Sequence, residues 1–241
     1  MEKLFPLMAI VFLSNLVEAC AGFGATILAI IFGAQFFAIE EMIPMLVPLN
    51  LILSTVIVVR YWGDIDRRAL FTKILPWAGA ALPFGILIFN IAPSKVLKLA
   101  FGIVVAALGL LELATVALTH RRGGGLGNPR KKLSPIQGRF LLLAGGLMQG
   151  LYASGGPFIV YFASREIADK RRFRTTLALL WLILNCALLA SLVIAGKITR
   201  ESLGSSALLL PAVLAGMFTG MRVHDRVSES TFRILVYALL T

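Results

Sequence analysis

Long apolar stretches separated by short polar segments make up most of this 241-residue chain. Eight apolar segments can be delimited, at residues 5–37, 42–59, 74–92, 96–118, 139–164, 175–195, 203–221 and 229–241. Most of them approach or exceed the roughly 20 residues that a helix needs to cross a bilayer. The pattern predicts an all-α, polytopic membrane protein, whose thirteen-residue last segment either is truncated or does not cross fully.

Two of these segments contain residues that a regular helix tolerates poorly. Gly155, Gly156 and Pro157 follow one another in the fifth segment, and interior glycine and proline cost a helix about 1 and about 3 kcal/mol relative to alanine. We expect a break there, with Pro157 opening a new half-helix. Gly22 and Gly24 predict a second break in the first segment. Because unpaired backbone groups are costly at membrane depth, such breaks favour a binding cavity, and a kink without a ligand is the alternative.

The two halves of the chain match each other in order. Corresponding positions recur at a spacing of 133 to 135 residues: 63–70 with 196–203, Pro76 with Pro211, and Gly85 with Gly220. Upstream, 18–24 falls opposite 149–155. The common order predicts a first membrane repeat at 1–119 and a second at 139–241. The basic segment at 120–138, which contains RRGGGLGNPRKK, is expected to be a flexible cytoplasmic linker.

The basic residues test how the segments cross the membrane. If all eight crossed once, thirteen Lys and Arg would face the linker side and ten the other side, which is almost no bias. If the broken fifth segment enters and leaves by one face, and Lys3 is set aside, eighteen face the linker side. The other side then keeps four: Lys95, Lys98, Lys197 and Arg200. This second arrangement satisfies the positive-inside rule. It predicts two inverted repeats, each with a broken, re-entrant helix hairpin and three transmembrane helices.

Composition agrees with a membrane protein, because 59% of the residues are hydrophobic and 15% are charged. The net charge of +11 comes from residues at the ends of apolar segments, so topology explains it better than nucleic-acid binding does. The run from Lys170 to Arg174 is interpreted as a topology anchor against anionic lipid headgroups. Cys20 and Cys186 lie inside apolar segments and are expected to be buried as small hydrophobic residues.

No enzyme template fits the chain. His120 and His224 are expected near loops, and neither HExxH nor GxSxG nor a glycine-rich loop with a nucleotide-binding lysine occurs. We therefore expect no enzyme activity, no metal and no cofactor.

Glu18 is the acidic residue that lies well inside an apolar segment of the first half, one turn before the glycine break. A carboxylate in the membrane costs about 3 kcal/mol or more, so its default interpretation is functional. Asn15, Glu18 and Gly22 share one helical face, which is expected to point at the cavity. Because apolar surroundings favour the neutral acid, Glu18 is the candidate for proton coupling. The alternative is a neutral or capped Glu18 that hydrogen-bonds across to the second repeat, where Gln149 cannot titrate.

Half-helices that begin near the two breaks would present backbone N–H groups at membrane depth, and such termini favour anions. Nearby hydroxyl groups suit sulfonate, sulfite or carboxylate oxygens. Asn50 with Ser54, and Trp181 with Asn185, either wall this site or join helices by hydrogen bonds, the second being the preferred interpretation. The substrate-binding candidates are Glu18, Gly22, Gly24, Thr26, Asn50, Gln149, Tyr152, Ser154, Gly155, Gly156, Pro157, Trp181 and Asn185.

Three motifs resemble the sulfite exporter TauE/SafE family of membrane permeases, also described as the toluene sulfonate uptake permease group. They are EACAGFGAT at 18–26, QGLYASGGPFIVY at 149–161, and KRRFRTT at 170–176 followed by Trp181. Similarity in order and spacing covers nearly the whole chain. The resemblance implies a permease of duplicated architecture that moves sulfite, sulfonates or related small organic anions across the cytoplasmic membrane. The chain departs from many members at 25–30, which lacks their fuller glycine run and downstream proline.

The leading hypothesis is a multi-pass secondary transporter of the inner (cytoplasmic) membrane for a small, sulfur-containing anion, with Glu18 as its proton site. The direction of transport stays open. A passive anion channel and a non-transporting membrane subunit are the alternatives. The expected partners are a small anionic substrate and the lipid bilayer, with no nucleic acid; a homodimer is compatible with the sequence.

Overall fold

The computed structural model describes residues 4–121 and 133–227, and every regular element in these residues is helical. The α-helices are α1 (Leu4–Ala21), α2 (Ala25–Gly33), α3 (Ile39–Arg60), α4 (Leu75–Ile91), α5 (Ser94–Arg121), α6 (Pro135–Tyr152), α7 (Gly156–Glu166), α8 (Lys170–Ile194) and α9 (Arg200–Arg226). A 3₁₀ turn, η1 (Trp62–Asp64), and a π-helical segment, η2 (Ala69–Ile74), precede α4. The all-α prediction is confirmed for these residues. The expected last segment at 229–241 and most of the linker lie outside them.

Four of these helical stretches are long and apolar enough to cross a membrane: Ile39–Arg60, Ala69–Ile91, Lys170–Ile194 and Arg200–Arg226. They correspond to α3, to η2 continued by α4, to α8 and to α9. At 1.5 Å of rise per residue, each is long enough for the roughly 30 Å of a hydrocarbon core.

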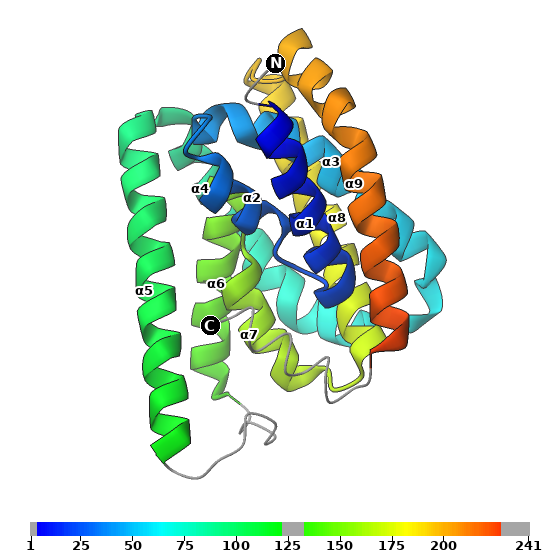
Figure 1. Cartoon of the computed structure of the whole chain (residues 1–241). Coiled ribbons are helices and arrows are strands. Elements are labelled where there is room, and N and C mark those ends of the chain that lie inside the picture. Colours follow the sequence, from blue (N-terminus) through cyan, green and yellow to red (C-terminus); the bar gives the residue numbers. More distant parts are fainter. Residues whose placement is uncertain (1–3, 122–132, 228–241) are drawn as a thin grey trace.

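The two broken segments form two helix hairpins, α1–α2 and α6–α7, each with a long and a short arm (Figure 1). A Cβ atom added at Gly33, the last residue of α2, would lie 3.2 Å from Leu7 near the start of α1. A Cβ atom added at Gly138, near the start of α6, would lie 2.7 Å from Phe162 near the end of α7. In both hairpins the chain therefore returns to the end from which it entered.

The positions of both breaks agree with the sequence prediction. Gly24 precedes the first residue of α2 with φ of 112°, and Gly22 has φ of 90°, values that residues with a side chain rarely adopt. The second short arm begins at Gly156, with Pro157 in its first turn. Proline is favoured there because its missing N–H would have had no intrahelical acceptor.

Each long arm packs against a helix from the other half of the chain. In Figure 1, α1 runs along α9, α6 runs along α4, and α3 lies against α8 between these pairs. Small residues allow backbone contact in both long-arm pairs. A Cβ atom at Gly216 of α9 would lie 2.3 Å from the carbonyl oxygen of Phe12, and one at Gly146 of α6 would lie 2.0 Å from that of Ala78. Such small-residue interfaces are typical of membrane helices.

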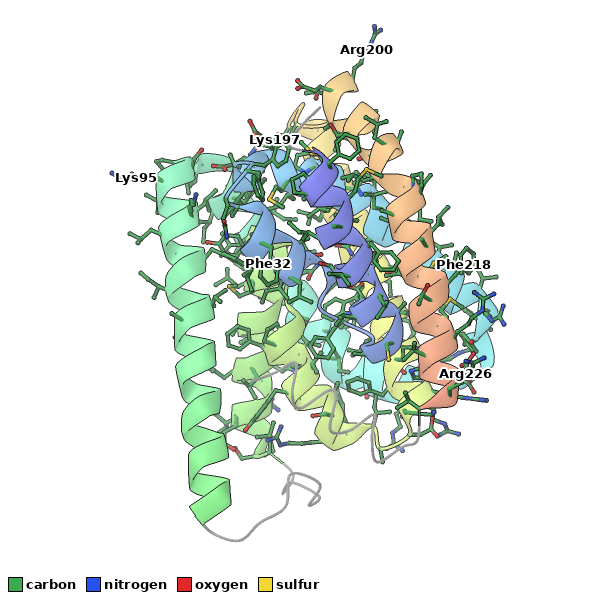
Figure 2. All side chains as sticks on the ribbon, in the orientation of Figure 1. Phe32, Lys95, Lys197, Arg200, Phe218 and Arg226 are labelled. Atoms are coloured by element: carbon green, nitrogen blue, oxygen red, sulfur yellow. The ribbon has the colours of Figure 1, made fainter. Side chains whose placement is uncertain are left out.

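Basic residues separate along the long axis of the bundle. Figure 2 shows Lys95, Lys197 and Arg200 at one end and Arg226 at the opposite end. We call the end with Arg226 the basic end, since Lys170 also lies there and donates to the carbonyl oxygen of His224 at 3.2 Å. The first hairpin opens at the other end, because Lys98 Nζ donates to the carbonyl oxygen of Ala34, just after α2, at 2.9 Å.

The second hairpin opens at the basic end, since α7 ends at Glu166, four residues before Lys170. The ion pair between Glu166 and Lys73 joins the end of α7 to η2. The charge count separates four basic residues from the others: Lys95, Lys98, Lys197 and Arg200. They belong to the end of the bundle opposite the Lys73–Glu166 ion pair.

The outer surface of the bundle is largely apolar, as Phe32 and Phe218 in Figure 2 illustrate. This explains one wrong prediction. Cys20 is buried, but Cys186 is exposed on α8. A helix in a bilayer is apolar on the face toward lipid as well as on the face toward protein, so hydrophobic neighbours do not show which way a small residue points.

Candidate functional site

A cavity lies where the tips of the two hairpins meet, halfway along the bundle. The volume of this cavity is about 20 Å³. A Cβ atom at Gly156 of the second tip would lie 3.3 Å from the ring of Phe23 in the first tip. The residues that line the cavity are Glu18, Phe23, Gly24, Thr26, Ile27, Asn50, Gln149, Ala153, Ser154, Gly156, Trp181 and Asn185.

Each hairpin caps its own short arm with a side chain from its long arm. The backbone N–H of Ala25 donates to Glu18 Oε2 at 2.7 Å, and the N–H of Gly155 donates to Gln149 Oε1 at 2.8 Å. The first N–H groups of a helix have no intrahelical acceptor, so a side-chain oxygen stabilises the start of each short arm. Glu18 and Gln149 occupy matching positions in the two halves of the sequence and play the same structural part.

The hydrogen bond of Glu18 supports a structural role for its carboxyl group without ruling out a functional one. Its carboxyl group is buried and does cap a helix, as the structural alternative supposes. The bond to Ala25 stays within the first hairpin, however, and does not reach the second half of the chain. Because Glu18 also lines the cavity, its carboxyl group lies where a ligand would meet it.

Polar side chains of α3 and α8 hold the two tips in place. Asn50 Nδ2 donates to Thr26 Oγ1 at 2.6 Å, and Gln149 Nε2 donates to Asn185 Oδ1 at 2.8 Å. Trp181 Nε1 donates to the carbonyl oxygen of Gly22 at 2.9 Å. Three residues of α3 and α8 therefore both line the cavity and form hydrogen bonds to the hairpins: Asn50, Trp181 and Asn185. The interpretation as cavity wall and the interpretation as helix-joining residues are both correct for them.

Nine of the thirteen sequence candidates line the cavity, and the other four lie beside it. Gly22 contributes its carbonyl oxygen to Trp181, and Gly155 supplies the capped N–H. Tyr152 points away from the cavity, since its hydroxyl group donates to the carbonyl oxygen of Leu97 at 2.9 Å. Pro157 lies in the first turn of α7.

The prediction that Asn15, Glu18 and Gly22 present one face to the cavity is wrong for two of the three. Asn15 donates to the carbonyl oxygen of Val11, one turn back along α1, and does not line the cavity. Gly22 follows the last residue of α1 and still donates its N–H to the carbonyl oxygen of Glu18 at 2.7 Å, but it does not line the cavity.

Sequence reasoning misplaced one basic residue near the first tip, Arg174, and did not foresee the burial of His224. Arg174 is fully buried, with Nη1 donating to the carbonyl oxygen of Ala19 at 3.1 Å, so it is not a headgroup anchor. His224 is fully buried in the last turn of α9, with Nδ1 2.7 Å from the carbonyl oxygen of Cys20. Both residues thus contact the carbonyl end of α1, where positive or donor groups are favoured. The spacing of Arg174 and Trp181 on α8, seven residues, could have indicated a shared face.

Phe23, Ile27 and Ala153 are the apolar lining residues that the sequence did not single out. Among the residues that the structure describes, no cluster of His, Cys, Asp or Glu could hold a metal ion. The site is therefore a small space with amide, hydroxyl and carboxyl groups and two helix N-termini around it.

A family model described as Sulfite exporter TauE/SafE matches residues 7–241. The matched range contains all the residues of the cavity and both hairpins except the first three residues of α1. Comparisons with curated proteins and with solved structures gave no match.

Proposed function

The chain belongs to the sulfite exporter TauE/SafE family of membrane transporters, and from this premise we propose that it is a secondary permease for a small anion, sulfite or an organosulfonate. The anion binds in the cavity between the hairpin tips, and the membrane is the inner (cytoplasmic) one. The observation that carries this proposal is the convergence of two short-arm N-termini on one cavity.

The groups around the cavity favour a negatively charged ligand. The first turns of α2 and α7 carry partial positive charge from the helix dipoles and N–H groups that lack intrahelical acceptors. Ser154, at the second tip, adds a hydroxyl donor. The cavity of about 20 Å³ holds about one water molecule, so a compact oxyanion needs less widening of it than an extended substrate does. Phe23, Ile27 and Trp181 would contact the apolar part of a small sulfonate.

Proton coupling follows from the position of Glu18. An anion in the cavity and an ionised Glu18 would repel each other strongly, because Glu18 is buried and lines the same space. Binding of the anion and binding of a proton to Glu18 therefore favour one another, as linked equilibria must. We infer that one proton accompanies the anion. The matching position in the second hairpin is Gln149, which has no proton to exchange, so the coupling belongs to the first hairpin.

An inverted repeat over 1–119 and 139–241 is the architecture that we propose for alternating access. The exchange of partners supports it, since α1 of the first half packs on α9 and α6 of the second half on α4. The matched caps and the opposite openings of the two hairpins are further support. In such transporters one unit moves against the other around a site at mid-membrane.

Transport by the purified protein in proteoliposomes tests the proposal. We expect sulfite or a sulfonate to accumulate when a proton gradient is imposed, and Glu18→Gln to weaken this accumulation more than anion exchange. Gradient-driven movement that is intact in Glu18→Gln would contradict the proton role. Equal movement with and without the gradient in the wild type would indicate a passive channel instead.

Glu41→Gln is the matched control. Glu41 is also a carboxylate that accepts a backbone N–H at a helix N-terminus, from Ala38 at 3.2 Å, but it is exposed at the start of α3. We expect this variant to transport like the wild type. A screen of sulfur oxyanions by thermal stabilisation would identify the substrate, and an absence of any stabilising anion would contradict the binding site.

A further inference from the structure

Arg174 is a buried cation without an ion-pair partner among the described residues. Its side chain is fully buried, and no ion pair found among the described residues includes it. Nη1 donates to the carbonyl oxygen of Ala19, whereas Nε and Nη2 have no hydrogen-bond partner. Asp225, which accepts from the hydroxyl group of Tyr61 at 3.4 Å, forms no ion pair with Arg174 within 4.0 Å, but its carboxylate acts on the guanidinium charge through space.

Such an arrangement is costly unless something compensates the charge. A buried ion without a counter-charge loses several kcal/mol of hydration, and buried polar atoms in native proteins almost always have partners. The ring of Tyr61, with its centroid 4.6 Å from the guanidinium carbon, compensates only a part of this cost. The Asp225 carboxylate compensates a further part through space, but Nε and Nη2 still lack hydrogen-bond acceptors, which an anionic group would supply.

The two unpartnered nitrogens define the shape of that group. Nε and Nη2 form one edge of the planar guanidinium, and their N–H bonds point in the same direction as a two-pronged donor. This edge fits two oxygen atoms of one carboxylate, sulfonate, sulfite or phosphate group. Nη1, at the opposite corner, is the nitrogen that holds the carbonyl end of α1.

Arg174 also lies next to the cavity on its basic-end side. Positions 174, 178, 181 and 185 share one face of α8, and Trp181 and Asn185 line the cavity. Gly22 separates Arg174 from this space. A Cβ atom at Gly22 would lie 3.1 Å from the Cα atom of Arg174, while its carbonyl oxygen accepts from Trp181. A movement of the first tip away from α8 would therefore join the guanidinium edge to the cavity.

We propose that Arg174 forms a second binding site for the transported oxyanion, between the cavity and the basic end. The anion binds to Nε and Nη2 and passes Gly22 on its way to or from the cavity. This inference rests on the proposed function, since it assigns the same class of small anion to both sites. It predicts two anions bound per chain at saturation.

Equilibrium dialysis of the detergent-purified full chain against labelled sulfite tests this site. We expect two bound anions in the wild type and one in Arg174→Met, which keeps the aliphatic bulk and removes the charge. Arg174→Lys keeps the charge without the two-pronged edge, so its second binding should be about 10- to 100-fold weaker. Arg171→Met, from the exposed part of the same basic run, is the control and should bind two.

The outcomes separate this inference from the proposed function. One anion bound equally by the wild type and Arg174→Met would overturn the second site and leave the cavity site standing. In that case Arg174 only clamps α1, and the variants should differ in melting temperature but not in anion binding. If Arg174→Met does not fold, Arg174→Lys decides, because unchanged affinity for both anions in that variant overturns the proposal. No binding by the folded wild type would contradict both sites together.

Discussion

Replacement of Gly146 by alanine should destabilise the protein through one backbone contact between α6 and α4. The added Cβ atom would lie 2.0 Å from the carbonyl oxygen, 2.7 Å from the carbonyl carbon and 2.8 Å from the Cα atom of Ala78. Ordinary contacts of a Cβ atom begin near 3.4 Å, so the two helices must separate by roughly 1 Å. Overpacking of this kind costs about 1–3 kcal/mol. For a chain of this size the melting temperature should fall by roughly 2 to 12 °C.

Gly79→Ala is the matched control, since Gly79 follows Ala78 on the same helix. Its added Cβ atom would meet only the Leu75 side chain, at 3.9 Å. Alanine also favours a helix by up to about 1 kcal/mol relative to glycine. Thermal unfolding in detergent, followed by tryptophan fluorescence, should thus show Gly79→Ala at or above the wild-type temperature. Equal melting of Gly146→Ala and Gly79→Ala would refute close backbone packing between α4 and α6.

Two further predictions concern the second cap and the orientation of the bundle. Gln149→Leu should lower the free energy of unfolding by about 2–6 kcal/mol, because the Gly155 N–H and Asn185 Oδ1 each lose a buried partner, and it should abolish transport. Gln149→Glu keeps the acceptor for the Gly155 N–H and should lose less stability. A wild-type melting temperature for Gln149→Leu would contradict the cap. In a cysteine-free background, an impermeant maleimide added outside cells should label Lys95→Cys but not Ala168→Cys, because the positive-inside rule predicts that the basic end faces the cytoplasm. Labelling of both positions from one side would contradict the assignment of these residues to opposite ends.

The helix breaks could be predicted from the sequence because their causes are local. Glycine widens and proline restricts the backbone angles at their own positions. Gly24 and the Gly155–Pro157 run therefore mark the starts of the short arms without reference to the rest of the fold. The match between Glu18 and Gln149 was visible for the same reason, since a cap acts within a few residues of its helix. These local signals also placed most of the cavity, because both tips contribute to it.

The burial of Arg174 could not be predicted, because it depends on how α8 is rotated. Successive residues of a helix point about 100° apart, so within one basic run Arg171 is exposed and Arg174 is buried. Which of them points inward is decided by contacts with Ala19 and Tyr61, far away in sequence. The exposure of Cys186 could not be predicted either, because lipid and the protein interior are equally apolar, and an apolar neighbourhood in the sequence does not distinguish them.

The pairing of α1 with α9 sets an order of events during synthesis. The helix at Leu4–Ala21 is made first, but the helix at Arg200–Arg226 that packs against it emerges about 200 residues later. At about 5–20 residues per second, the first hairpin waits roughly 10 to 40 s in the membrane with its Gly216 and Gly220 contacts unmade. During that interval the bond from Ala25 to Glu18 is already available, because both residues belong to the hairpin itself. The Glu18 side chain, which lines the cavity in the folded protein, is thus available first to stabilise the newly synthesised hairpin.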